Sequence, residues 1–365
     1  MANFVALEMP LGKPLVQAIR RCLDAEWAFC VLDPNQSILR RTEALAALRP
    51  THIWSDEATP TPLANGRTLR EGDGAVVFTS GSSGAPKAAV LTWEALRQSA
   101  TLTSTALARE SQPTWLAALP PTHIGGLAVL LRCVLGPAEL LFDHDVADGA
   151  EFGATHVAVV RTQLARYDTS AYECVLLGGG PAPNSVASNV VTTWGMTETG
   201  SGVLYDGTPL PGVRVAVLDG ELLIASPTLF SRYLDSDRPS VTHEGYLDWF
   251  PTGDGASLHD GVVSIHGRLG YVINTGGEKV WPEDLERLFT EVEGVNDVAV
   301  VGRDDDEWGQ RIVACVVTDE DDATILDRLR AVAKEHVGRW AQPKSIERVA
   351  VIPRTANGKI NRSAL

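Results

Sequence analysis

A short loop rich in hydroxyl side chains and glycine constrains this chain more than any other stretch. Residues 78–88 read Phe-Thr-Ser-Gly-Ser-Ser-Gly-Ala-Pro-Lys-Ala. The apolar run Gly74–Phe78 before it predicts a buried strand, and Thr92 after it predicts the N-cap of a helix. A small-residue loop between a strand and a helix is the usual context of a phosphate-binding site. Glycines let backbone N–H groups approach an anion, and hydroxyls and a lysine add further donors.

The spacing excludes a Walker loop, because Pro86 precedes Lys87 and Ala88 follows it, where that loop ends in Gly-Lys-Ser or Gly-Lys-Thr. A loop rich in Ser and Gly is, by itself, more often a solvated turn. The order Thr-Ser-Gly-Ser-Ser-Gly-x-Pro-Lys is much rarer, and it resembles the phosphate loop of the adenylate-forming enzymes, the superfamily of acyl-CoA synthetases, adenylation domains and luciferases. The resemblance implies that this loop binds the ATP phosphates through Thr79, Ser80, Gly81, Ser82, Ser83, Gly84 and Lys87.

Size and charge narrow the class of protein. A chain of 365 residues is long enough for two domains. The net charge of −15 argues against nucleic acid or an anionic membrane as the main partner. The five cysteines are scattered without a Cys-x-x-Cys pair, which indicates reduced core thiols in a cytoplasmic protein rather than a zinc site or disulfides. The N-terminus lacks the pattern of a signal peptide, and no segment is a good membrane span.

The order of elements predicts an α/β fold. Short apolar segments alternate with helical stretches between Trp115 and Leu177, which is the rhythm of a mostly parallel sheet. Turn signals between short strands over 207–233 predict a β-rich subdomain.

The last part of the chain predicts a small α+β domain. A helix should begin at Pro282, and Thr324 with Asp327 resembles a capping box that opens a second helix. We therefore expect a large N-terminal domain of layered sheets over 1–268, a hinge at 269–271 and a small mobile C-terminal domain over 272–365.

Several further segments match the adenylate-forming enzymes in the correct order. Residues 193–199 read Thr-Trp-Gly-Met-Thr-Glu-Thr and resemble the family's aromatic-Gly-x-Thr-Glu segment. The resemblance implies that Trp194 stacks on the adenine, that Thr197 binds the α-phosphate and that Glu198 holds Mg²⁺ through oxygen coordination.

Three glycines end the last predicted strand of the sheet, at Gly178, Gly179 and Gly180. Ligands bind beyond such strand ends, although a tight turn is the alternative interpretation. The resemblance favours an adenine pocket here. It also implies that Asp254, in Thr-Gly-Asp, binds the ribose hydroxyls and that Arg268 contacts ribose or phosphate.

A single histidine is usually a structural residue, but His123 lies between a predicted strand and an apolar helix, in Pro-Thr-His-Ile-Gly-Gly. The family carries a similar Pro-x-x-His-x-x-Gly segment beside its carboxylate substrate. The resemblance therefore implies that His123 and Gly125 lie in the carboxylate pocket.

The C-terminal region carries two more matching motifs. Residues 274–280 resemble the glycine loop along the pantetheine route, which implies that coenzyme A contacts Thr275, Gly276, Gly277 and Lys279. A lysine near a C-terminus is normally a surface residue, but Lys359 follows Pro-x-Thr-x-x-Gly, the family's pattern around its catalytic lysine. The hinge position, often Asp or Lys in the family, is Gly270, whose backbone freedom suits a pivot.

The implied reaction is the ATP-dependent joining of a small carboxylic acid to coenzyme A, through an acyl-adenylate, with Mg²⁺ and no prosthetic group. The compact length, the Thr-His-Ile-Gly-Gly-Leu to Leu-Arg-Cys-Val segment and the Asn-Thr-Gly-Gly-Glu-Lys-Val loop resemble the short 2-succinylbenzoate–CoA ligases of menaquinone synthesis. A second substrate carboxylate needs a cation, and Arg132 is a candidate, although a helix arginine usually points to solvent. Another aryl- or fatty-acyl-CoA ligase and a non-catalytic nucleotide-binding relative are the alternatives, and a homodimer is possible.

Overall fold

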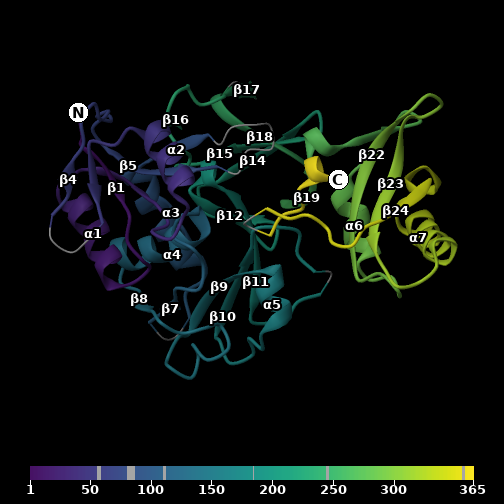
Figure 1. Ribbon diagram of the computed structural model, residues 1–365, viewed down its shortest axis with the longest axis horizontal. Helices are drawn as coiled ribbons and strands as arrows, with labels where there is room; N and C mark the ends of the chain where they lie inside the picture. The colour runs from purple at the N-terminus through teal and green to yellow at the C-terminus, as the bar shows by residue number, and fades with distance from the viewer. Residues whose placement is uncertain (56–58, 80–86, 110–111, 184, 244–245, 356–357) are drawn as a thin grey trace. The chain divides into compact units, whose positions relative to one another are not determined.

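The computed structural model describes the chain except for residues 56–58, 80–86, 110–111, 184, 244–245 and 356–357 (Figure 1). It divides into two compact units: Met1–Gly179 with Val186–Arg214 and Ile224–Phe250, and Gly180–Ser185 with Val215–Leu223 and Pro251–Leu365. The expected hinge at 269–271 lies inside the second unit, so the proposed division at residue 268 stays a prediction. None of the described helices has the length and apolarity to cross a membrane.

The first unit contains a seven-stranded sheet with the order β16-β6-β5-β2-β1-β3-β4. Strand β1 is parallel to β2 and β3, and β2 is parallel to β5. Helix α2 contributes Leu48 to the apolar cluster on one face of this sheet. The bounds are β1 Phe4–Leu7, β2 Ala28–Val31, β3 His52–Trp54, β4 Thr61–Pro62, β5 Asp73–Phe78, β6 Ala88–Thr92 and β16 Arg232–Tyr233, with α1 Lys13–Asp24 and α2 Ile38–Leu48.

A second seven-stranded sheet follows, with the order β13-β12-β11-β10-β9-β7-β8. Five neighbouring strands of this sheet are parallel: β8, β7, β9, β10 and β11. This confirms the predicted mostly parallel sheet. The bounds are β7 Thr114–Leu116, β8 Glu139–Leu141, β9 His156–Val160, β10 Cys174–Gly178, β11 Val190–Met196, β12 Ser201–Tyr205 and β13 Thr208–Pro209, with helix α5 at Arg161–Arg166.

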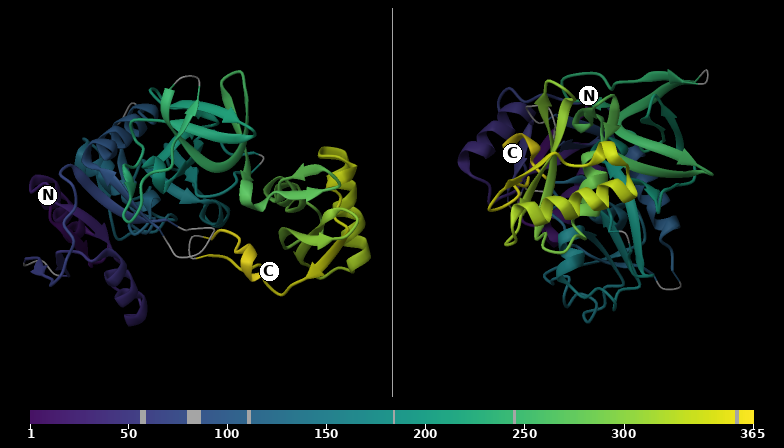
Figure 2. Two further views of the ribbon diagram at one scale, coloured as in Figure 1. Left: turned by 90° about the horizontal axis from the view of Figure 1, so that it is seen from above. Right: turned by 90° about the vertical axis from the view of Figure 1, so that its right-hand side faces the viewer.

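Two helices pack between these sheets, as Figures 1 and 2 allow the reader to follow. Helix α3 (Trp93–Ala106) contacts β5 and β6 of the first sheet and β12 of the second, and it also contacts α4 (Ile124–Leu135). The hydroxyl of Thr92 accepts a hydrogen bond from the Ala95 N–H at 3.1 Å, which confirms the predicted N-cap. Helix α4 is apolar on most sides because α3, α1 (Lys13–Asp24) and strands β8, β9 and β12 of the second sheet surround it.

A third sheet has the order β14-β15-β18-β17, with β19 paired to β18. The prediction of one β-rich subdomain over 207–233 needs correction, because β13 belongs to the second sheet and β16 to the first. Those short strands extend existing sheet edges, where unpaired backbone groups find partners. The bounds are β14 Arg214–Leu218, β15 Glu221–Ala225, β17 Val241–His243, β18 Tyr246–His259 and β19 Val262–Arg268.

The last sheet, in the second unit, has the order β21-β20-β23-β22, with β24 beside β23. Alternate residues of β22 face opposite ways: Val298 and Val300 pack with helices α6 and α7, while Ala299 and Val301 pack with Ile352 of the C-terminal segment. The bounds are β20 Ile273–Thr275, β21 Glu278–Val280, β22 Asp297–Asp305, β23 Gly309–Val317 and β24 Ser345–Arg348, with α6 Pro282–Phe289, α7 Asp322–His336 and the 3₁₀ turn η3 Arg339–Ala341.

The sequence predicted the first residues of the two helices in this unit. Helix α6 begins at Pro282, as expected. The capping box at Thr324 is wrong, because Asp321 is the N-cap of α7. Its carboxylate accepts from the N–H groups of Ala323 and Thr324, and the Thr324 hydroxyl donates to it as well.

A buried ion pair fastens β16 to the first sheet. Arg232 donates to both oxygens of Asp73, at 2.9 and 2.7 Å, and both side chains are almost fully buried. Removing one partner leaves an uncompensated buried charge, so we expect Asp73→Asn to lower the free energy of unfolding by about 3–5 kcal/mol. Urea unfolding measures this loss. The control is Asp235→Asn, which breaks the exposed Arg67–Asp235 pair and should cost less than about 1 kcal/mol. Equal losses in the two variants would contradict this account of the pair.

Candidate active site

The predicted phosphate loop connects two antiparallel strands. Strands β5 and β6 pair along the loop's flanks, and the Thr79 N–H donates to the Lys87 carbonyl at 2.7 Å, which closes the base of the loop. The helix predicted after the loop begins only at Trp93, because the apolar run 88–92 first pairs with β5. Ser80, Gly81, Ser82, Ser83 and Gly84 lie outside the described residues, so their contact with phosphate stays a prediction.

Lys87 and Glu198, far apart in the sequence, share one neighbour in the structure. The Lys87 ammonium lies 5.1 Å from the ring centroid of Tyr233, and the Tyr233 hydroxyl donates to Glu198 Oε1 at 2.9 Å. A cation over a tyrosine ring is attracted by the ring's negative face. Sequence reasoning missed Tyr233, which has no motif of its own and reaches this place because β16 pairs with β6. The phosphate-loop lysine and the acidic motif residue therefore belong to one cluster.

Glu198 fits the expected magnesium ligand. It lies in the 3₁₀ turn η1 (Thr197–Thr199) after β11, and it is buried, with Tyr233 bound to one carboxylate oxygen. Over the described part of the chain, no three His, Cys, Asp or Glu side chains gather into a metal cluster. Mg²⁺ at nucleotide sites usually takes one or two protein carboxylates, substrate phosphates and water, so a single glutamate suits it.

Strands β10 and β11 bring the predicted adenine residues next to each other. The strands pair in parallel, with Leu177 opposite Thr192, so Gly178 and Trp194 lie near the same end of the sheet. A Cβ on Gly178 would meet the Thr193 side chain at 3.0 Å, and Gly179 has φ of +84°, which only glycine adopts readily. Gly180 has open space where a Cβ would stand. These glycines shape the backbone here, and their contact with adenine stays a prediction.

His123 is the N-cap residue of α4 and is half-buried. The helix begins at Ile124, so both following glycines lie in its first turn. Gly126 is the glycine that the packing requires, because a Cβ there would lie 2.3 Å from the Pro120 carbonyl oxygen. A Cβ on Gly125 would meet only Leu119, at 3.5 Å. This glycine therefore serves the packing of the helix start, and the contact of His123 and Gly125 with a substrate carboxylate stays a prediction.

Arg132 points into the interior instead of toward solvent. Its exposure is 2%, and its guanidinium carbon lies 4.5 Å from the ring centroid of Trp115. Its Nη1 has no hydrogen-bond partner within the described residues, and no described carboxylate forms an ion pair with it. Burial lowers the pKa of Arg132. The side chain borders a small crevice together with Leu96, Ser99, Ala100, Ala128, Leu131 and Gly200.

Such an arrangement is costly for the protein alone. A buried cation normally has a carboxylate partner, because an unpaired one loses its hydration without compensation. The Arg132 guanidinium is thus a buried positive group among mostly apolar side chains, and its Nη1 has no hydrogen-bond acceptor among the described residues.

In the second unit, the two predicted ribose residues contact each other. Asp254 and Arg268 stand opposite on β18 and β19, and Arg268 Nε lies 2.9 Å from Asp254 Oδ1. Arg268 also donates from Nη1 to the Thr252 carbonyl at 2.9 Å. These bonds orient both side chains, so the pair is preorganised to bind a diol or a phosphate oxygen.

The predicted glycine loop is a tight hairpin between β20 and β21. Gly276 and Gly277 both have positive φ, of +59° and +86°, as the two central residues of such a turn require. Trp308, which the sequence reasoning missed, lies against this turn: its carbonyl accepts from the Gly276 N–H at 2.9 Å, and its ring would meet a Cβ on Gly276 at 2.8 Å. Thr275 before the turn is buried, and Lys279 after it is exposed.

Lys359 is exposed and follows Gly358, whose φ is +75°. The Thr355 N–H donates to the Lys359 carbonyl at 2.8 Å. Asn357, which precedes Gly358, lies outside the described residues. Gly270, the predicted pivot, lies in the 3₁₀ turn η2 (Leu269–Tyr271), with no atom within 4 Å of an added Cβ.

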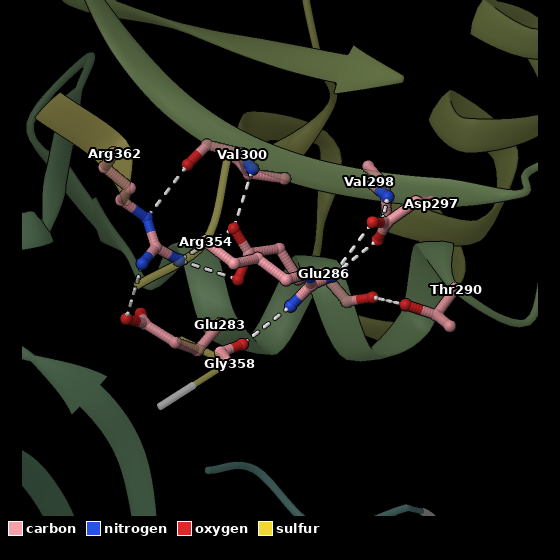
Figure 3. Close-up of polar contacts among 9 residues, drawn as sticks. All are labelled: Glu283, Glu286, Thr290, Asp297, Val298, Val300, Arg354, Gly358 and Arg362. Carbon is pink, nitrogen blue, oxygen red and sulfur yellow. Dashed lines mark hydrogen bonds and ion pairs between the residues drawn. The ribbon is translucent and has the colours of Figure 1, made fainter. Parts of the chain in front are cut away.

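A buried charge cluster anchors the chain just after Lys359. Arg362, in the 3₁₀ turn η4 (Arg362–Ala364), donates from Nη2 to both oxygens of Glu286, at 2.7 and 2.6 Å, and its Nη1 lies 3.4 Å from Glu283 (Figure 3). Glu286 also accepts from the Val300 N–H at 2.7 Å. Burial raises the pKa of Glu286 to about 7, and the Arg362 charge opposes that rise.

This pKa predicts a pH dependence of stability. Between its ordinary value of 4.5 and about 7, the folded chain holds a proton on Glu286 that the unfolded chain releases. The contribution of this group to the free energy of unfolding is therefore complete below about pH 4.5, and it is lost as the pH rises toward 7. Chemical unfolding of the wild type and of Glu286→Gln at several pH values tests this. The fall should be smaller in the variant, and parallel curves would contradict the shifted pKa.

Comparison with known proteins agrees with these motifs. The AMP-binding enzyme family matches residues 49–234, and the AMP-binding enzyme C-terminal domain matches residues 284–359. A Mycobacterium tuberculosis protein named probable 2-succinylbenzoate–CoA ligase is 35% identical, over 99% of this chain and 97% of its own. The 2-succinylbenzoate–CoA ligase of Listeria monocytogenes is 33% identical, over 80% of this chain and 69% of its own.

The fold is also shared with solved structures. The o-succinylbenzoate coenzyme A synthetase of Bacillus subtilis, in complex with ATP and a magnesium ion, has a TM-score of 0.84 and 22% identity, covering 100% of this chain and 89% of the other. The matches span both units and include the phosphate loop, the Thr-Glu motif and the lysine segment. The chain is a member of the AMP-binding enzyme family.

Proposed function

We propose that this protein is an AMP-forming acid–CoA ligase whose substrate is 2-succinylbenzoate, a step of menaquinone synthesis. Family membership supports the reaction type, and the ligases of Mycobacterium tuberculosis and Listeria support the substrate. The observation that most supports this choice of substrate is the buried guanidinium of Arg132, which has no acidic partner among the described residues. Its five cysteines are all buried free thiols, which suits a cytoplasmic enzyme.

In the first half-reaction, a substrate carboxylate oxygen attacks the α-phosphorus of ATP. The new bond joins that oxygen to phosphorus, the bond from the α-phosphorus to the bridging oxygen breaks, and pyrophosphate leaves. The difficulty is that an anion attacks an anion. Lys87, Thr197 and Lys359 would supply fixed positive charge and donors at the phosphates, and Glu198 would hold Mg²⁺, which neutralises the phosphate charge when bound.

In the second half-reaction, the coenzyme A thiolate attacks the acyl carbonyl carbon and AMP leaves as the acyl–oxygen bond breaks. Trp194 and the glycines at 178–180 would bind adenine, and Asp254 with Arg268 would bind ribose throughout. Thr275, Gly276, Gly277 and Lys279 would line the pantetheine route. We further propose that the C-terminal part reorients between the half-reactions with Gly270 as its pivot, which exchanges the Lys359 loop for the glycine loop.

Arg132 would bind the substrate carboxylate that is not activated, with His123 and Gly125 beside the one that is. A guanidinium forms short paired hydrogen bonds to a carboxylate, and such bonds are strong where water is excluded. This role explains why the chain tolerates the cost of an unpaired buried charge, since the substrate completes the pair.

A panel of acids tests the proposal. The protein is incubated with ATP, Mg²⁺, coenzyme A and one of 2-succinylbenzoate, benzoate, malonate or a fatty acid, and the thioesters are identified by mass spectrometry. We expect the 2-succinylbenzoyl thioester to form much faster than any other. A preference for benzoate or fatty acids would keep the reaction and exclude the substrate. Absence of every thioester would exclude the reaction.

A further inference from the structure

The segment that carries Lys359 is held by one arginine on each side, Arg354 to strand β22 of the last sheet and Arg362 to helix α6. Arg354 lies five residues before the lysine and Arg362 three residues after it. Arg354 and Ile360 form a β-bridge, and the Asn361 N–H donates to the Pro353 carbonyl at 2.8 Å. The lysine therefore stands on a short two-sided loop whose two sides are joined by backbone hydrogen bonds.

Arg354 links this loop to strand β22. Its Nη2 donates to both oxygens of Asp297, at 2.8 and 3.0 Å, and its Nη1 donates to the Gly358 carbonyl at 3.1 Å (Figure 3). Asp297 is itself oriented by the Val298 N–H, at 2.9 Å. The guanidinium thus joins the first residue of a rigid strand to the carbonyl that directly precedes Lys359.

The two arginine contacts differ in burial, and this difference separates their roles. The Arg362 pair is almost buried, at 11% and 10% side-chain exposure, so its loss should harm folding and activity together. The Arg354 pair is partly exposed, at 37% and 34%, so it contributes little to stability. What it adds is a side-chain restraint on the Gly358 carbonyl, next to Lys359, beyond the backbone hydrogen bonds between Thr355 and Lys359.

We propose that Arg354, held by Asp297, is a positioning residue that aims Lys359 during formation of the acyl-adenylate. This inference rests on the role of Lys359 in the proposed function. A lysine ammonium on a long flexible side chain stabilises a transition state only when its backbone is held, and an error of about 1 Å can cost on the order of 10²-fold in rate. Arg354 supplies that restraint without touching the substrate.

The experiment compares Arg354→Ala, Arg354→Lys and Asp297→Asn with the wild type in each half-reaction. Adenylation is measured as acid-dependent exchange of pyrophosphate into ATP, and thioester formation is measured from synthetic 2-succinylbenzoyl-AMP and coenzyme A. We expect Arg354→Ala to lower kcat of adenylation by about 10- to 100-fold, with little change in KM for ATP, in thioester formation or in Tm. Arg354→Lys should be intermediate, because one ammonium cannot hold Asp297 and the Gly358 carbonyl as a planar fork does.

Asp297 provides a coupling test, and Arg348 provides the control. If Arg354 acts through Asp297, the double variant Arg354→Ala with Asp297→Asn should form the acyl-adenylate no more slowly than Arg354→Ala alone. Arg348 has similar exposure and binds Asp322 and two backbone carbonyls away from the lysine loop, so Arg348→Ala should leave both half-reactions unchanged.

Three results would overturn the inference: unchanged adenylation in Arg354→Ala, an equal loss in both half-reactions together with a lower Tm, or the same loss in Arg348→Ala. Lys359→Ala separates this failure from failure of the proposed function. If Lys359→Ala loses adenylation and Arg354→Ala does not, only the positioning role is wrong. If Lys359→Ala retains adenylation, the assignment of the lysine fails and the positioning role fails with it.

Discussion

Replacing Lys359 with alanine should lower the rate of acyl-adenylate formation by about 10²–10³-fold, the usual cost of removing one preorganised donor from a charged transition state. Thioester formation from synthetic acyl-AMP should be largely unchanged, because that step has no attack of an anion on phosphate. The KM for ATP should change less than kcat, since the lysine acts on the charge that develops during the reaction.

The two half-reactions are assayed separately by pyrophosphate exchange and by thioester release. Lys334→Ala is a suitable control, because Lys334 is an exposed lysine on α7 of the same unit. Equal losses in the two half-reactions would contradict the proposal that the lysine serves adenylation alone.

Replacing Arg132 with leucine should lower kcat/KM for 2-succinylbenzoate by about 10²-fold or more, because the substrate's second carboxylate loses its only proposed cation in a water-excluded site. Activity toward benzoate, which has no second carboxylate, should fall far less, so that the variant discriminates poorly between the two acids. Stability should hold or rise, since leucine removes a buried charge that has no acidic partner among the described residues.

The prediction combines a loss of activity toward 2-succinylbenzoate with an unchanged or higher Tm, a combination that simple destabilisation would not produce. Arg132→Lys keeps the charge but loses the planar fork, and we expect an intermediate kcat/KM. Arg20→Leu is a neighbouring control, because Arg20 is exposed on α1 and donates to the Cys133 carbonyl beside Arg132. A lower Tm with equal losses for both acids would assign Arg132 a structural role.

The sequence predicted the start of a helix correctly where one residue determines it. Thr92 caps α3 and Pro282 starts α6, because their side chains act on the backbone beside them. The start of α7 was wrong since Asp321 and Thr324 both suit an N-cap, and only the folded chain shows which carboxylate reaches the free N–H groups.

Contacts between residues far apart in the chain could not be predicted from the sequence. Tyr233 meets Glu198 and Lys87 only because β16 joins the edge of the first sheet, and no local pattern announces that pairing. The interior position of Arg132 depends on α4 packing against α3, α1 and the second sheet, which reverses the usual preference of a helix arginine for solvent. Motif order, by contrast, was sufficient to indicate the family, because it reflects the chemistry of the ligand rather than the packing.

Exchange of labelled pyrophosphate into ATP, measured without coenzyme A, tests the central claim most directly. An acyl-adenylate that forms reversibly returns label to ATP only when the correct acid is present. We predict rapid exchange that requires both Mg²⁺ and 2-succinylbenzoate and that does not need coenzyme A. Exchange that is absent with 2-succinylbenzoate, or equally fast with no acid at all, would contradict the account.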